Sequence, residues 1–320
     1  MLDEWTDKFR QLLLDQTSEG WNAAIKLKED HLPRRIFKFF RPTEYALKNL
    51  EEGTVFLASP EDFNDPFDSG ISMNVLPLLE HLVRTQEFEG LKDLEKIGLS
   101  RGDFADMLAG RVDEEVIARM AATESGSSPE ALRALVELLP TLSQSVNQEM
   151  MVDRTHSFFR KALKVTSFTE TANSPLLWAH YAENHKGFCV EYDPRSISPN
   201  LPQRRLLFPV LYDAKRFDAG PSFLKSMTSR GKDDLPNQAF LAALHKSPDW
   251  AYEREWRIVN PDGRENGFSV PMAEPTAVYG GVRMSEKDRN TLASLCSQVR
   301  VALRTPQLSA DGYDIDLSGI

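Results

Sequence analysis

Hydrophobic positions along the chain follow a helical spacing in some stretches and a strand spacing in others. Apolar residues at intervals of three and four predict an amphipathic helix over residues 3–16, and Thr43 is placed to cap a second helix that runs to Leu50. Short runs rich in β-branched and aromatic residues predict strands. These runs cover residues 34–41, 55–59, 165–169, 188–192, 206–212, 253–259 and 277–280. Together they predict an α+β fold with a mixed or antiparallel central sheet.

Residues 72–163 interrupt this pattern, because they carry helical spacing and few strand signals. The helical patterns are Val75–Thr85, Phe104–Leu108, Glu114–Ala122 and Pro129–Leu139. We therefore expect a large all-α insertion that serves as a lid or a partner surface. The predicted organisation is a helical segment at 1–33, a core domain at 34–71 and 164–304, the insertion at 72–163, and a tail at 305–320.

One chemically dense segment begins at Ser174, which is a good helix N-cap and is followed by Pro175. Gly187 suits the residue just past the end of this helix, and Phe188 to Tyr192 predict a strand. The polar and aromatic side chains that this segment offers to a ligand are Trp178, His180, Tyr181 and His185.

A second dense segment begins at Ser247 and leads into a predicted strand from Glu253 to Val259. Alternate residues of a strand point to the same side and lie roughly 6.5–7 Å apart. Glu253, Glu255 and Arg257 would therefore share one face, and both carboxylates could contact one ligand. A neighbouring guanidinium would keep these carboxylates ionised.

Composition narrows the function classes. The chain has 320 residues, of which 41% are hydrophobic, and a formal net charge of −10, so a global basic footprint for duplex nucleic acid is absent. Its two cysteines cannot form a disulfide framework or a zinc site, which fits a reducing cytoplasm. The acidic N-terminal residues predict no signal peptide, and without an apolar run of about 18 residues we expect no membrane partner.

Several common catalytic motifs are missing from the sequence. Neither of the glycine-rich phosphate-binding patterns occurs, which argues against a Rossmann dehydrogenase and a P-loop NTPase. The zinc-protease pattern His-Glu-x-x-His and the hydrolase pattern Gly-x-Ser-x-Gly are also absent.

Three motifs in a fixed order point to one family. They are Ser59-Pro60 with Phe63–Asp68, then Trp178–Ala182 with His185–Phe188, and finally Glu253-x-Glu255-Trp256-Arg257. Together they resemble the bacterial family known as domain of unknown function 2971 (DUF2971), over roughly residues 35–300. The family name itself implies no chemistry.

The layout also resembles the ADP-ribosyltransferase fold, in which a first-strand cation, a Ser/Thr-rich strand and a late Glu act on NAD. This resemblance implies NAD as the substrate and no metal. It departs from the pattern in having no His in the first strand, and Lys38 and Arg41 compete for that role. The implied site residues are Lys38 or Arg41, then Ser167 and Thr169, and then Glu253 and Glu255 as catalytic carboxylates.

The NAD hypothesis predicts how the candidate site residues would contact the ligand. Glu255 would hydrogen-bond the ribose, Arg41 would hold a phosphate, and Tyr181 or Trp178 would stack on the nicotinamide ring. The loop at Asn64 and Asp65 could lean over the ligand, with His180, His185 and Arg257 nearby. The biological setting implied is a toxin or phage-defence effector with an unknown protein or nucleic-acid target.

Two other functions stay open. A metal-dependent nuclease or phosphodiesterase could take its Mg²⁺ ligands from Asp65, Asp68, Glu191, Glu253 and Glu255. A non-catalytic sensor or interaction module would use the insertion as its binding surface. The same residues also have structural interpretations, which are core packing for the aromatic side chains and a solvated strand face for the glutamates.

Overall fold

The computed structural model describes residues 4–15, 17–72, 100–108, 114–123, 157, 160–161, 163–220, 235–261 and 266–317. The chain divides into two compact units. The first comprises residues 1–69, 160–215 and 243–320, and the second comprises residues 70–159 and 216–242.

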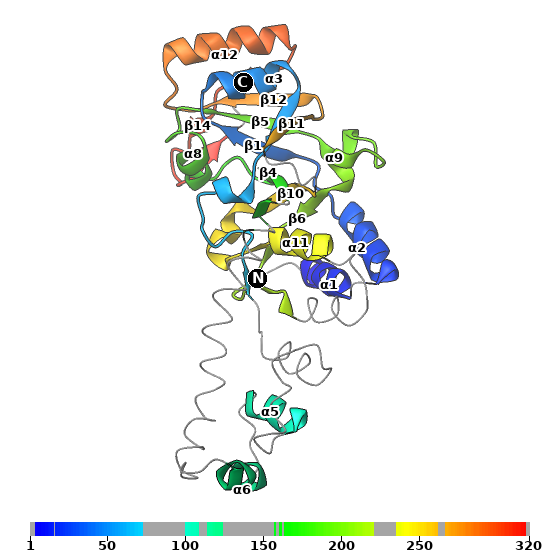
Figure 1. Ribbon diagram of the computed structural model, residues 1–320. Helices are drawn as coiled ribbons and strands as arrows, with labels where there is room; N and C mark the ends of the chain where they lie inside the picture. Colours follow the sequence, from blue (N-terminus) through cyan, green and yellow to red (C-terminus); the bar gives the residue numbers. More distant parts are fainter. Residues whose placement is uncertain are drawn as a thin grey trace. The chain divides into compact units, whose positions relative to one another are not determined.

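A seven-stranded sheet forms the centre of the first unit, with strand order β13-β12-β5-β1-β4-β10-β6 (Figure 1). Neighbouring strands run antiparallel, apart from the parallel pair β12–β13. The strands are β1 (Ile36–Phe40), β4 (Lys164–Thr169), β5 (Phe188–Tyr192), β6 (Leu207–Pro209), β10 (Glu255–Asn260), β12 (Pro275–Gly280) and β13 (Leu303–Arg304). The predicted α+β class is therefore confirmed, and the central sheet, predicted to be mixed or antiparallel, is mostly antiparallel.

Helices and short strand pairs surround this sheet. The helices are α1 (Glu4–Leu14), α2 (Ser18–Asp30), α3 (Glu44–Glu51), α8 (Pro175–Tyr181), α9 (Pro202–Arg205) and α12 (Glu286–Gln298), with 3₁₀ turns η1 (Pro60–Asp62), η4 (Pro194–Ser196) and η5 (Pro248–Glu253). The short pairs are β2 (Thr54–Leu57) with β11 (Phe268–Pro271), β7 (Leu211–Tyr212) with β9 (His245–Lys246), and β14 (Gln307–Leu308) with β15 (Ile315–Asp316).

The second unit is described in part. It contains the parallel pair β3 (Ile71–Ser72) and β8 (Phe217–Asp218), helices α5 (Arg101–Leu108) and α6 (Glu114–Thr123), and most of α11 (Leu235–Leu244). Helices α5 and α6 coincide with predicted helical patterns. The patterns at 75–85 and 129–139 lie outside the described residues, so an all-α insertion over 72–163 stays a prediction.

Alternate side chains of β1, β5 and β12 enter two different hydrophobic cores, one on each face of the sheet. On one face Trp256 and Ile258 pack with Leu50 of α3 and Leu292 of α12, as their alternation in the sequence predicts. Figure 1 shows α12 beside α3 at this side of the sheet. The other face holds a core with Trp178 of α8, whose members are Phe37, Ala172, Trp178, Ala182, Cys189, Ala277, Tyr279 and Ile315.

Several element boundaries differ from the predictions, and three of the differences bear on the motif-bearing segments. Helix α8 ends at Tyr181, short of Gly187, because the chain turns through Glu183, Asn184 and His185, all at positive φ. The strand predicted over 206–212 is split into β6 and β7. The strand predicted from Glu253 begins at Glu255, since Glu253 closes η5.

Helix α2 lies within the segment at 1–33 that was predicted to be helical, whereas helix α12 and strand β11 were not predicted. No helix in the described part of the chain combines the length and apolar character needed to cross a membrane.

Candidate functional site

A cleft opens in the sheet where β1 and β4 part. Within the described strands, β1 and β4 are paired at Phe37 and Thr169, whereas β1 stays paired with β5 along its whole length and β4 stays paired with β10. The cleft has a volume of about 930 Å³, and both strands contribute to its walls. Strands β1, β4 and β10 thus meet at one cavity.

Most of the predicted site residues line this cleft. They come from the end of β1, from the loop after η1, from β4, from α8 and from the η5–β10 junction. They are Lys38, Arg41, Asn64, Ser167, Thr169, His180, Tyr181, Glu253, Glu255 and Arg257.

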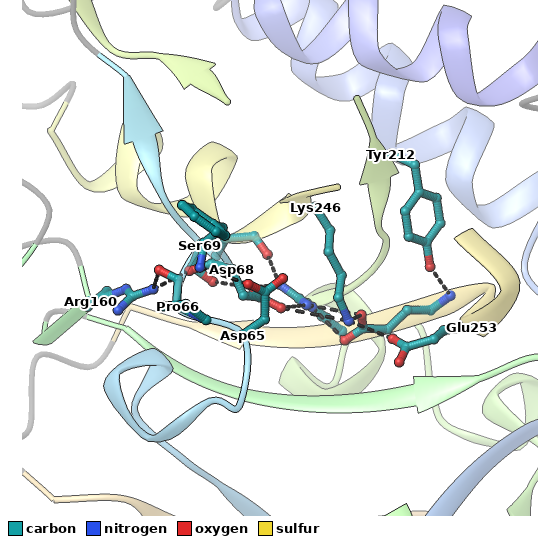
Figure 2. Close-up of polar contacts among 12 residues, drawn as sticks. Asp65, Pro66, Asp68, Ser69, Arg160, Tyr212, Lys246 and Glu253 are labelled. Atoms are coloured by element: carbon teal, nitrogen blue, oxygen red, sulfur yellow. Dashed lines mark hydrogen bonds and ion pairs between the residues drawn. The ribbon is translucent and has the colours of Figure 1, made fainter. Parts of the chain in front are cut away.

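Lys246 connects the two glutamates at the floor of the cleft. Its Nζ lies 2.5 Å from Oε2 of Glu253 and 2.9 Å from Oε2 of Glu255. The Tyr181 hydroxyl donates to the other oxygen of Glu253 at 2.7 Å. Figure 2 shows Lys246 directed at Glu253 from the neighbouring β9 strand. Each carboxylate oxygen of Glu253 therefore accepts one hydrogen bond.

Arg257 ties the same cluster to the loop that follows η1. Its guanidinium makes two bonds to Asp68, at 2.7 and 2.6 Å, and two to Glu255, at 2.7 and 3.0 Å. The remaining donor capacity goes to the carbonyl oxygen of Ala243 at 2.7 Å. Arg257 is only 1% exposed, so this planar fork is held rigidly inside the protein.

The local backbone explains how both glutamates reach one cluster. Glu253 ends η5, and Arg254 follows in the left-handed conformation with φ 46° and ψ 54° before Glu255 begins β10. The hydroxyl of Thr169 donates to the carbonyl oxygen of Glu253 at 2.5 Å, and the amide of Glu255 donates to the Tyr212 hydroxyl at 2.9 Å. These bonds tie the junction to Thr169 of β4 and to Tyr212 of β7.

The two glutamates have opposite electrostatic environments. Burial acts to raise the pKa of Glu255, but Arg257 and Lys246 hold that pKa well below its ordinary value. Burial and the negative charge of Glu255 raise the pKa of Glu253, and Lys246 offsets only part of this effect. The pKa of Lys246 is raised, since Glu255 and Glu253 outweigh the effect of its burial. The cluster thus contains one firmly ionised carboxylate and one that gains a proton more readily.

The two candidates for the first-strand cation differ in position. Lys38 lies in β1 and donates to the Ser167 carbonyl oxygen across the split at 3.1 Å. Arg41 follows β1 and is exposed while still lining the cleft. Arg41 can therefore meet a ligand from solvent, and Lys38 is fixed in the cleft wall.

Three predicted site residues are placed elsewhere. Trp178 is 1% exposed and donates to the Ala172 carbonyl oxygen at 2.7 Å, so it belongs to the core. The ring of His185 stacks beside Trp178, with a centroid separation of 6.4 Å. The carboxylate of Asp65 accepts a bond from the amide of Phe67 at 2.8 Å, which is the Asx-type turn that its sequence context allows.

Sequence reasoning missed Lys246 and Tyr212 altogether. Lys246 directly precedes the Ser247 cap and belongs to none of the sequence motifs. It reaches the two glutamates from β9, which pairs with β7. Asp68 belongs to the Phe63–Asp68 motif, but its ion pair with Arg257 could not be predicted. The two residues are far apart in the sequence, and no nearby residue indicates that they meet.

The acidic side chains do not form a cation site in the part of the chain described. No group of three or more His, Cys, Asp or Glu side chains there is arranged to hold a metal ion. Asp68, Glu253 and Glu255 instead direct their oxygens at Lys246 and Arg257. Glu191 is also engaged, since the hydroxyls of Thr276 and Tyr279 donate to it.

Comparison with known proteins identifies one relationship. Residues 177–258 match the model of a family described as protein of unknown function (DUF2971). The resemblance to DUF2971 is confirmed over this stretch. It contains Tyr181, Lys246 and the Glu253–Arg257 motif, whereas Lys38, Arg41 and Asp68 lie outside it.

Searches of the curated proteins and of the solved structures found no significant match. The relation to ADP-ribosyltransferases therefore stays a prediction, and the DUF2971 match indicates no activity.

Proposed function

We propose that the cleft is the active site of an enzyme that cleaves the glycosidic bond of NAD, as an ADP-ribosyltransferase or an NAD glycohydrolase. The observation that carries this proposal is the buried carboxylate of Glu253, held by Tyr181 and Lys246 at the floor of an open cleft. Ionisable groups with perturbed pKa values in a cleft are typical of functional sites.

The chemistry suits a carboxylate that accepts few hydrogen bonds. Breaking the bond between nicotinamide and ribose develops positive charge on the ribose carbon, and a nearby carboxylate stabilises that charge. Glu253 fits this role better than Glu255, because two hydrogen bonds from Tyr181 and Lys246 reach its carboxylate, whereas the Glu255 carboxylate accepts three from Arg257 and Lys246. In this proposal Glu255 is a positioning residue that holds Lys246 and Arg257 in place.

The rest of the cleft supports a large, anionic and aromatic ligand. Its volume lies near the upper end of the range of about 300–1,000 Å³ typical of small-molecule sites. Arg41 offers a guanidinium that can bind a pyrophosphate oxygen pair. Tyr45 and Phe56 are 84% and 46% exposed and line the same cleft, so they offer ring faces to a ligand base.

The molecule that accepts the ADP-ribose group decides which of the two activities the protein has. Water as acceptor would make the protein a glycohydrolase, and a nucleophile on a protein or nucleic acid would make it a transferase. Both described cysteines, Cys189 and Cys296, are free and buried, which suits the cytoplasm. There NAD consumption or target modification would serve a toxin or a phage-defence effector.

The test is release of nicotinamide from NAD, measured by chromatography for the wild-type protein and for Glu253→Gln. We expect the variant to lose at least about 100-fold in rate, as when one transition-state-stabilising group is removed. Glu274→Gln is the matched control, because Glu274 is a carboxylate outside the cleft lining. Undiminished nicotinamide release by a folded Glu253→Gln variant would overturn the assignment.

A further inference from the structure

Among the lysines that line the cleft, Lys38 and Lys246 have opposite environments. Lys246 is ion-paired with Glu253 and Glu255, which keep it charged. Lys38 has no carboxylate within ion-pair distance among the residues described, and Glu255 acts on it only over a longer range. Lys246 is held by the two glutamates and Lys48 pairs with Glu52, so Lys38 is the described cleft lysine without a carboxylate partner, and the proposed NAD chemistry gives it no role.

The amine of Lys38 is held between two aromatic rings. Its Nζ lies 5.4 Å from the ring centroid of Phe168 and 5.7 Å from that of Phe40. A single hydrogen bond, to the Ser167 carbonyl oxygen at 3.1 Å, fixes its direction. An ammonium group has three donors, so this bond leaves most of its donor capacity unused within the described structure. Strand β1 lies in the middle of the sheet and holds the side chain at the cleft wall.

Burial without a paired carboxylate favours the neutral amine, whereas the faces of the Phe40 and Phe168 rings favour the ammonium form. Burial lowers the pKa of Lys38 to about 8, and the opposing effect of the Glu255 carboxylate does not restore it. The neutral form of an amine is the nucleophile, and desolvated lysines serve this purpose in known enzymes. Other charged or titratable groups that line the cleft include Arg41, Asp68, His180, Tyr181, Lys246, Glu253 and Arg257.

We propose that Lys38 is a nucleophilic amine that captures the carbonyl carbon of an aldehyde or ketone bearing an anionic group. The nitrogen lone pair attacks the carbonyl carbon, and a proton moves from nitrogen to oxygen to give a carbinolamine. Loss of water then leaves a C=N bond, so the step needs no oxidant or reductant. Arg41 lines the same cleft and supplies the cation for a phosphate or carboxylate on the ligand.

The experiment uses pyridoxal 5′-phosphate as the probe and borohydride to reduce any imine to a stable secondary amine. Modified lysines are located by peptide mass spectrometry over a pH series from neutral to about 10. Lys48 is the internal control, because it lines the same cleft but its side chain is 66% exposed and pairs with Glu52 at 3.6 Å.

We expect Lys38 to be modified at least about tenfold faster than Lys48 at neutral pH, because more of it is neutral there. The midpoint of its pH profile should lie near 8. Equal or slower modification of Lys38, or a midpoint shared with Lys48, would overturn the proposal. Lys38→Arg should abolish modification at this position while the unfolding transition is preserved.

A second comparison tests the anionic part of the ligand. Arg41→Gln should slow capture of pyridoxal 5′-phosphate several-fold and leave capture of the neutral probe glycolaldehyde unchanged. Equal effects on the two probes would remove Arg41 from the proposal. None of these measurements requires NAD cleavage, so the amine and the proposed NAD activity succeed or fail independently.

Discussion

At the scale of single residues, two buried glutamates at the floor of the cleft share one lysine but differ in their other contacts. Lys246 contacts both glutamates, but only Glu255 also receives the fork of Arg257. Removing one partner of a buried ion pair leaves an uncompensated charge, which costs much more than losing an exposed pair. The pKa of Glu255 is lowered and that of Glu253 is raised, so their contributions to stability should depend on pH in opposite directions.

Glu255→Gln should lower the free energy of unfolding at pH 7 by about 3–5 kcal/mol, because Arg257 and Lys246 lose a buried partner. The folded-state pKa of Glu255 is lowered, so its contribution is present above the unfolded value of about 4.3 and is lost as the pH falls. The gap between wild type and variant, measured by urea unfolding, should thus close in acid.

Glu253→Gln should show the reverse trend. The folded-state pKa of Glu253 is raised, so its contribution is present below about 4.3 and is lost as the pH rises through the folded value. Relative to wild type, this variant should gain stability between acid and neutral pH. A larger loss at pH 7 for Glu253→Gln than for Glu255→Gln would contradict this division of roles.

At the scale of elements, the close packing of the turn after α8 against β1 shapes the cleft wall. A Cβ on Gly187 would lie 2.0 Å from the carbonyl oxygen of Phe40 and 3.0 Å from Cα of Ala182. Phe40 itself lines the cleft, so a shift of this turn reaches the site. Glycine at this position is thus required by a close approach of two backbones.

Gly187→Ala should destabilise the protein by about 3 kcal/mol, because backbone atoms must move to admit the methyl group. Gly53→Ala is the control: φ is +63° there and nothing lies within 4 Å of an added Cβ. Its cost should be about 1–2 kcal/mol, from the left-handed backbone alone. Thermal or urea unfolding separates the two values, and equal costs would contradict the packing argument.

The elements also show what the sequence can and cannot predict. Thr43 caps α3 as predicted, and its hydroxyl accepts a bond from the amide of Ala46, because capping is decided by neighbours in the chain. The period of two likewise predicts which side of β10 enters the core. The split between β1 and β4 could not be predicted, since strand pairing depends on contacts far apart in sequence. Lys246 was missed for the same reason.

At the scale of the whole molecule, distant stretches of the first unit complete one cleft. Every residue that lines it belongs to residues 1–69, 160–215 or 243–320. The chain leaves this unit after Ser69 and returns at Arg160, whose guanidinium donates to the carbonyl oxygens of Pro66 and Asp68 at 2.8 and 2.7 Å (Figure 2). The two ends of residues 70–159 are therefore close enough for a short connection.

Replacing residues 70–159 by a Gly/Ser linker of about six residues should leave the first unit folded, because a short flexible linker costs little closure entropy. Circular dichroism and a cooperative urea transition would report the fold, and modification of Lys38 would report an intact cleft. An insoluble product, or one without a cooperative transition, would show that these residues are required for the fold.

In the proposed function, Glu253 lies beside the reacting bond of bound NAD. Soaking crystals with NAD, and other crystals with Mg²⁺ or Mn²⁺, tests it most directly. We predict density for NAD or its product in the cleft, with the ribose carbon about 3–3.5 Å from a Glu253 oxygen and the pyrophosphate at Arg41. A divalent ion bound between Asp68 and Glu253, with no nucleotide in the cleft, would contradict the account and favour metal-dependent hydrolysis.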